Sequence, residues 1–170
     1  MNEDASSNFG ILIAYLIPGA IVLLGLTPFS PLLQGWFASS PPDAPSIGGF
    51  LFLTVAALAA GMTVGAVRWA IVDSFHAWSG LPVPDFDFSK LGPNVEAFRL
   101  LIEIHYRHYQ FYANSGVATA FAYVCHRISL GFHGSWGWLD LGVAFLEVVF
   151  FVTSRDTLHK YYHRSRQLLR

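Results

Sequence analysis

Two sets of polar side chains recur at near-regular intervals within apolar stretches of the chain. The members are His108, Ser115, Thr119 and His126 in one stretch, and Asp140, Glu147 and Ser154 in the other. Intervals of four and seven residues place each set in one narrow sector of a helix. If these two helices pair antiparallel across the short segment between them, Thr119 would lie near Glu147 and His126 near Asp140.

Glu147 is the first candidate for a functional residue. An ionisable side chain near the middle of a bilayer costs at least roughly 2.5 kcal/mol on insertion scales, so such groups usually face protein or water. One interpretation is that Glu147 belongs to an ion or proton pathway. The other is that its protonated carboxyl bonds Thr119 or Ser115 and joins two helices. The sequence leaves both interpretations open.

The composition favours a membrane protein over a soluble enzyme. Of the 170 residues, 54% are hydrophobic and 12% are charged, about half the charged fraction usual for a soluble domain. So few charged groups cover the surface of a soluble domain poorly. A net charge of −1 disfavours nucleic acid as a partner, and the high apolar content disfavours a disordered chain. The single cysteine, Cys125, excludes an intrachain disulfide.

Four apolar segments predict four membrane-spanning helices. They cover about residues 9–27, 48–71, 108–128 and 138–153. The first contains no charge over 19 residues, close to the length that spans a hydrocarbon core of roughly 30 Å. Glu3 and Asp4 precede it without a Lys or Arg, which argues against a cleaved signal peptide. The expected fold is an all-α four-helix membrane bundle over residues 9–153.

The distribution of Lys and Arg predicts the orientation of these helices. Nine basic residues would lie on one side of the membrane against Arg127 on the other, a strong positive-inside bias. Residues 1–8, 72–107 and 154–170 are therefore expected in the cytoplasm, with both termini, and a bacterial inner membrane is the expected location. The 28–47 loop is expected outside, and its five prolines predict no regular element there.

The third and fourth helices are expected to extend beyond the membrane. Helical spacing from Val95 to Ile128 gives about 34 residues, or roughly 50 Å of helix. The fourth helix would continue through the tail, whose basic face carries Arg155, His159, Lys160, His163, Arg164, Arg166 and Arg170. This face could bind a cytosolic protein as part of a stalk, or membrane lipids as an interfacial helix. No proline or glycine lets the tail bend, which favours the stalk.

Two further patterns bear on assembly and on metal binding. Ala57, Gly61 and Gly65 form a small-xxx-small run that lets another helix approach closely, from the same chain or from a second copy. Two groups of potential metal ligands are close in sequence: His159 with His163, and Glu103 with His105 and His108. However, the chain has no Glu-x-x-His pair and no HExxH motif. We therefore expect no metal and no cofactor.

The leading hypothesis is a homo-oligomeric membrane scaffold or pore whose cytoplasmic extension binds a soluble protein. One alternative is a small membrane effector of a bacterial defence system that permeabilises the membrane. The other is a membrane enzyme that uses a metal held by His and Glu at the cytoplasmic face. An enzyme is the less favoured reading, and the sequence does not identify the ion, the partner or the stoichiometry.

Overall fold

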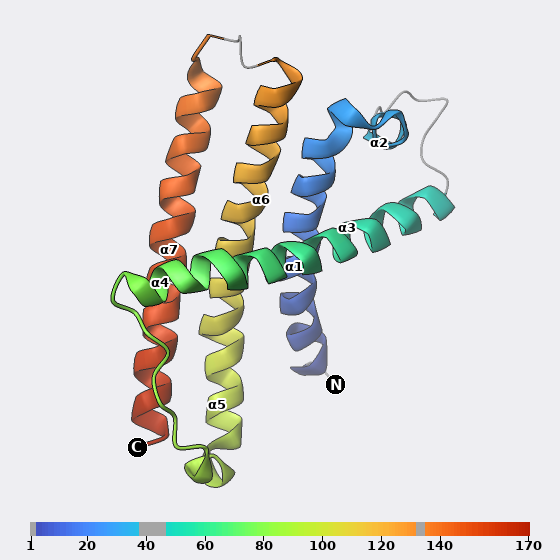
Figure 1. The fold of residues 1–170 in the computed structure, drawn as a ribbon. Helices are drawn as coiled ribbons and strands as arrows, with labels where there is room; N and C mark the ends of the chain where they lie inside the picture. The colour runs from blue at the N-terminus through green and yellow to red at the C-terminus, as the bar shows by residue number, and fades with distance from the viewer. Residues whose placement is uncertain (1–2, 38–46, 132–134) are drawn as a thin grey trace.

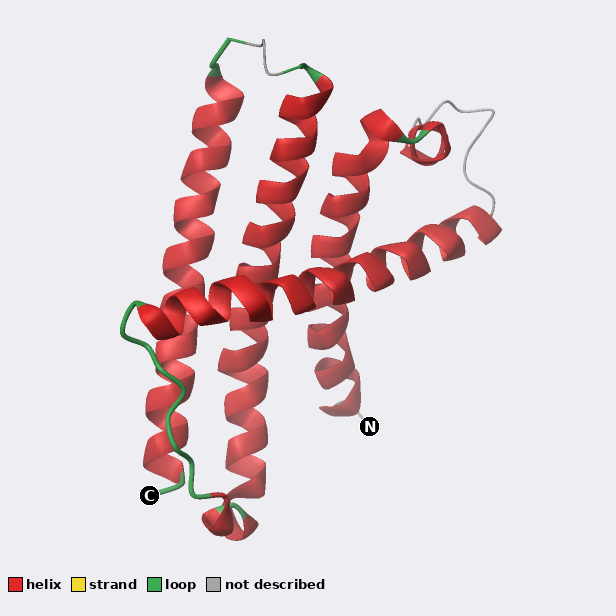
Figure 2. Ribbon diagram, viewed as in Figure 1, coloured by secondary structure: helices red, strands yellow, loops and turns green. Residues whose placement is uncertain are grey.

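Three long helices lie side by side in the computed structural model, which describes residues 3–37, 47–131 and 135–170 (Figure 1). They are α1 (Glu3–Leu26), α6 (Arg107–Ser129) and α7 (Trp138–Leu168), with α6 in the middle. The described residues form helices and connections only (Figure 2), so the all-α prediction is confirmed for them. α1 begins at Glu3, inside the segment expected to precede the first span.

α3 (Ile47–Arg68) crosses this layer instead of aligning with it (Figure 1). It continues through a π-helical turn, η2 (Trp69–Asp73), and α4 (Ser74–Trp78) as one helix. The structure therefore differs from the expected bundle of four aligned helices. At the crossing, a Cβ atom on Gly61 would lie 1.9 Å from the Tyr15 carbonyl oxygen, so the two backbones touch. Contact at glycines leaves few side-chain ridges to align the helices.

The helix expected from Val95 is present as one continuous element. It comprises α5 (Val95–Leu101), the π-helical turn η5 (Ile102–Tyr106) and α6. α7 likewise runs unbroken from Trp138 to Leu168. The lower halves of the two helices pack through a buried cluster of Tyr109, Ala113, Leu158 and Tyr161.

The expectation that the prolines of residues 28–47 exclude a regular element is wrong for part of that segment. Thr27–Phe29 is a 3₁₀ turn, η1, and Pro31–Phe37 is a short helix, α2. Pro31 opens α2, a position where the missing N–H has no intrahelical partner to lose. Pro41, Pro42 and Pro45 lie outside the described residues. The 79–94 connection contains two more 3₁₀ turns, η3 (Phe88–Lys90) and η4 (Gly92–Asn94).

Two helical stretches are long and apolar enough to cross a membrane, judged by length and composition. They are Leu12–Phe29 and Gly48–Trp78, which correspond to the first two expected spans. The expected spans in α6 and α7 stay predictions. α7 nevertheless exposes large apolar side chains along its first half, including Leu141, Phe145 and Val148.

Candidate functional site between α6, α7 and the end of α3

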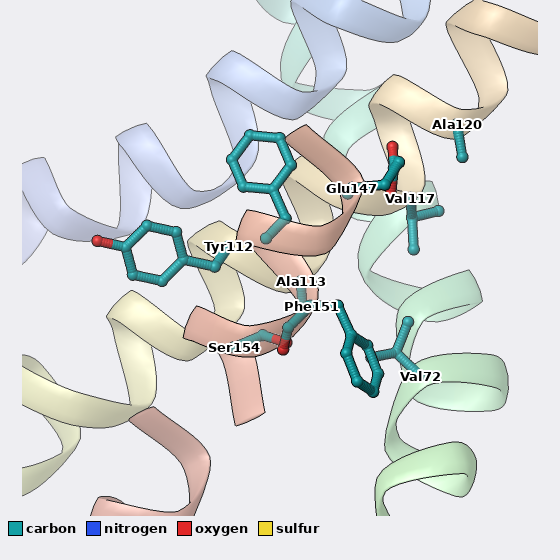
Figure 3. Close-up of a pocket in the computed structure, with 10 residues that line it drawn as sticks. Val72, Tyr112, Ala113, Val117, Ala120, Glu147, Phe151 and Ser154 are labelled. Carbon is teal, nitrogen blue, oxygen red and sulfur yellow. The ribbon is translucent and has the colours of Figure 1, made fainter. Parts of the chain in front are cut away.

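A pocket of about 170 Å³ lies between α6 and α7, next to Val72 of η2 (Figure 3). α6 contributes small side chains to its wall, Ala113, Gly116 and Ala120. α7 contributes two polar side chains, Glu147 and Ser154, and Tyr112 of α6 also lines the wall. The small residues of α6 leave the room that these polar groups occupy.

Glu147 is half-buried, and its carboxylate lies against the backbone of Gly116. A Cβ atom at Gly116 would be 3.5 Å from Glu147 Oε2. The other oxygen, Oε1, is buried and has no hydrogen-bond partner among the described residues. The hydroxyl of Ser115 is also buried without a partner, so the expected Ser115–Glu147 bond is absent. Ser115 precedes Gly116, and one residue turns the side chain about 100° around the helix, away from α7.

His76 of α4 contacts Ser154, one of the residues that line the pocket. Its side chain is fully buried, and Nε2 lies 3.3 Å from Ser154 Oγ. The Phe151 ring stacks on the imidazole at 5.2 Å between centroids. Nδ1 is buried without a partner among the described residues. Sequence reasoning missed His76 because the second span was expected to end at about residue 71.

A buried ion pair stands beside His76. Arg68 Nη1 lies 3.0 Å from Asp73 Oδ1, and the Tyr109 hydroxyl donates a hydrogen bond to the same carboxylate. The Arg68 guanidinium lies 5.1 Å from the centre of the Tyr109 ring. Arg68 and Asp73 are five residues apart, the spacing that a π-helical turn brings together. The η2 turn therefore positions the pair, and no sequence pattern predicts that turn.

The other end of the α6–α7 hairpin carries a second polar cluster. Asp140 caps α7 by accepting from the Gly137 backbone N–H at 2.6 Å. It also accepts from the Tyr123 hydroxyl and lies 3.5 Å from Arg127 Nη1. His126 was expected beside Asp140, but its side chain is exposed, and Arg127 takes that place.

The four polar residues expected along one side of α6 therefore do not all face α7. Ser115 is buried and Thr119 is half-buried, whereas His108 and His126 are exposed. His108 lies near Glu103 and Arg107 in a separate hollow beside α1. Of the seven residues in the two polar sets, Glu147 and Ser154 share the pocket.

The small-xxx-small run of α3 packs against α1 of the same chain. Gly61 faces the Tyr15 backbone, and a Cβ atom at Gly65 would lie 3.1 Å from the Tyr15 ring. Ala57 of α3 packs against Gly19 of α1, because a Cβ atom at Gly19 would lie 1.7 Å from the Ala57 carbonyl oxygen.

The basic tail lies along α5 and η5 as a straight continuation of α7. Arg155 donates to Ser79 Oγ at 2.5 Å, and Arg164 Nη1 lies 2.6 Å from His105 Nε2. Burial, followed by the charge of Arg164, lowers the pKa of His105. Burial also raises the pKa of Tyr162 to about 12.

The remaining tail side chains are at the surface. Lys160 pairs with Asp156 at 2.6 Å, and His163 lies 6.2 Å from His159, ring to ring. Arg166 and Arg170 are exposed near the C-terminal end.

The histidine pairs do not gather into a metal centre. Among residues 3–37, 47–131 and 135–170, no three His, Cys, Asp or Glu side chains are placed to hold a metal ion together.

Comparisons with known proteins add no further assignment. No protein-family model matches the chain, and no curated protein and no solved structure shows significant similarity to it.

Proposed function

We propose that the chain spans a bacterial inner membrane four times and that copies of it assemble into an ion-permeable pore, with Glu147 in the permeation path. The observation that carries the proposal is the Glu147 carboxylate, half-buried in the pocket between α6 and α7 with one oxygen unpaired. A carboxylate held at such a place is costly unless it meets water or an ion. A helix-joining role receives little support, because Oε1 lacks a protein donor.

Exposed tryptophans support the membrane location. Trp136 and Trp138, at the start of α7, are 81% and 89% exposed, and Trp69 and Trp78, near the end of α3, are 70% and 82% exposed. Tryptophans at two levels are typical of the two interfaces of a bilayer. Between these levels, α7 exposes aliphatic and aromatic side chains, which suit lipid or a second copy of the chain.

The ends of the helices also suit the proposed orientation. α2, the end of α6 and the start of α7 lie toward one end of the molecule, whereas the 79–94 connection and the C-terminus lie toward the other (Figure 1). Arg127 is the basic residue next to the α6–α7 connection, and its charge is balanced by Asp140. Between Leu141 and Thr153 the one ionisable residue is Glu147. These features favour α6 and α7 as the third and fourth spans.

Thiol labelling tests this orientation. In a Cys125→Ser background, a cysteine at the exposed position Ser129 should react with a membrane-impermeant thiol reagent in whole cells, because it lies on the outer side. A cysteine at exposed Ser89 should react after permeabilisation only. Labelling of Ser89→Cys alone in intact cells would reverse the orientation. Equal labelling of both would contradict the membrane proposal.

Substitution of Glu147 tests permeation. Glu147→Gln keeps the shape of the side chain and removes its charge, so ion flux into proteoliposomes should fall by at least about tenfold. Thermal stability should stay close to that of the wild type. Asp156→Asn, an exposed acid on the same helix outside the pocket, is the matched control and should leave flux unchanged. Wild-type flux in Glu147→Gln would refute a role for Glu147 in permeation.

The cytoplasmic extension is proposed as the site where a soluble protein binds. Its support is the tail geometry: one face of α7 packs through Leu158, Tyr161 and Ser165, which leaves Arg166 and Arg170 exposed. Such an arrangement also suits an effector whose pore opens when a partner binds.

A further inference from the structure

We propose that the permeating species is the proton, and that Glu147, Ser154 and His76 pass it along the pocket. The inference rests on the proposed function, because it names the ion that the Glu147 pocket carries. Ser154 connects the two halves of this path: it lines the pocket that holds Glu147, and its hydroxyl contacts His76.

The chemistry of His76 suits a relay. Ser154 Oγ donates to the Phe151 carbonyl oxygen at 2.9 Å, so the contact with His76 is satisfied when Nε2–H donates to Ser154 Oγ. Nδ1 then carries a lone pair, buried and without a partner among the described residues. An imidazole accepts a proton at one nitrogen and releases another from the second.

The transfer can be written with every proton accounted for. A proton that binds His76 Nδ1 forms the imidazolium, and the Nε2–H bond then breaks as Ser154 Oγ takes that hydrogen. The original hydroxyl hydrogen of Ser154 leaves the Phe151 carbonyl and passes to water in the pocket. Water delivers a proton to the Glu147 carboxylate. The ring, now protonated at Nδ1, regains the starting Nε2–H tautomer when Nε2 takes up a proton and Nδ1 releases one. The reverse sequence carries a proton the other way.

The pocket has room for the water that this path needs. Glu147 and Ser154 lie seven residues apart on α7, roughly 10 Å along the helix axis. A volume of about 170 Å³ holds several water molecules at roughly 30 Å³ each. The two polar side chains lie at separate points of the pocket wall, and Figure 3 shows them on one helix, with Ser154 further along it than Glu147.

Asp73 is the carboxylate that acts on His76 from the same continuous helix. It lies three residues before His76, and its side chain is 29% exposed, whereas His76 is fully buried. Arg68 and Tyr109 hold its carboxylate in place. The charged groups that act on His76 are Asp73 and, from α7, Arg155.

A proton fits this site better than a metal cation. The pocket offers one carboxylate and the hydroxyl-bearing side chains Ser154 and Tyr112, and its other walls are apolar, including Val117, Phe150 and Phe151. Hard cations such as Ca²⁺ take six or more oxygen ligands. A proton needs a chain of hydrogen bonds and no such ligand shell.

Proteoliposomes test the relay. Purified chain is reconstituted with an internal pH-sensitive dye for proton flux and, in parallel, with an internal sodium indicator. His76→Gln keeps an N–H that can donate to Ser154 and removes the titratable ring, and Ser154→Ala removes the hydroxyl. Each should lower proton flux by about a hundredfold, the lower end of the range for a positioned proton-transfer group. Ser165→Ala, a fully buried serine further along α7, is the matched control and should keep wild-type flux.

The outcomes separate this inference from the proposed function. Proton flux that depends on Glu147 but is unchanged in both His76→Gln and Ser154→Ala would overturn the relay and leave the pore in place. Sodium flux that depends on Glu147, without proton flux, would overturn the proton as the permeating species. Absence of both fluxes would refute the pore itself. Gel filtration checks each variant for folding, and if His76→Gln fails to fold, Ser154→Ala decides.

Discussion

Gly61→Ala should prevent α1 and α3 from forming their native crossing. The added Cβ atom would lie 1.9 Å from the carbonyl oxygen and 2.7 Å from the carbonyl carbon of Tyr15. Both are backbone atoms, so no side-chain rotation relieves the clash, and the helices must separate. Overpacking by side chains alone costs about 1–3 kcal/mol. A backbone clash should exceed that range, a large part of a typical net stability of about 5–15 kcal/mol.

Thermal unfolding in detergent and the yield of monodisperse protein measure this effect. Gly19→Ala should behave like Gly61→Ala, because its Cβ atom would lie 1.7 Å from the Ala57 carbonyl oxygen. Gly142→Ala is the matched control: it lies inside α7 with no atom within 4 Å of the added carbon. Alanine should stabilise that helix by about 0.5–1 kcal/mol. A Gly61→Ala protein that melts like the wild type would show that α3 does not cross α1 at this point.

Arg68→Ala should lower the free energy of unfolding by about 1.5–3 kcal/mol, because the Asp73 carboxylate loses its charged partner and keeps only the hydrogen bond from the Tyr109 hydroxyl. The Arg68 side chain is 7% exposed and that of Asp73 is 29% exposed, so water replaces the lost interaction only in part. Asp73→Asn should also lower the free energy of unfolding, because it leaves the buried Arg68 guanidinium without its carboxylate. The double variant Arg68→Met with Asp73→Leu should recover much of the loss, since it leaves no buried charge unpaired.

Unfolding of the single and double variants by heat or denaturant decides this prediction. Lys160→Ala is the control, because its ion pair with Asp156 is about half exposed on both sides and should contribute less than about 1 kcal/mol. A double variant as unstable as the sum of the single ones would mean that Arg68 and Asp73 act independently.

Hydropathy predicted where the helices lie but not how they cross. Residues 9–27 and 48–71 were identified because an uninterrupted apolar run of that length has few other structures to adopt. The angle between α1 and α3 depends on which small residues meet, and Gly19 was not paired with Gly61 by any pattern in the sequence. Pro31 misled the prediction for a related reason, since a proline excludes a helix interior and favours a helix start.

The candidate site was predicted in part. The seven-residue repeat identified Glu147 and Ser154, which share the pocket. The repeat does not predict which side of α6 faces α7, because that side carries small residues such as Gly116, which let α7 approach, and not the polar residues of the repeat. Asp73 and His76 were missed because η2 carries the helix past its expected end, and a π-helical turn has no clear sequence signal.

The crossing of α1 and α3 makes the continuous helix of α3, η2 and α4 a lever with its pivot at Gly61. From Gly61 to His76 the helix is about 22 Å long, at 1.5 Å per residue. A turn of about 5° around the pivot therefore displaces the far end by roughly 2 Å. The His76–Ser154 contact is 3.3 Å long, so a displacement of that size breaks or re-forms it. A small change in tilt at the centre of the fold is thus magnified at the entrance to the pocket, where α4 meets α7.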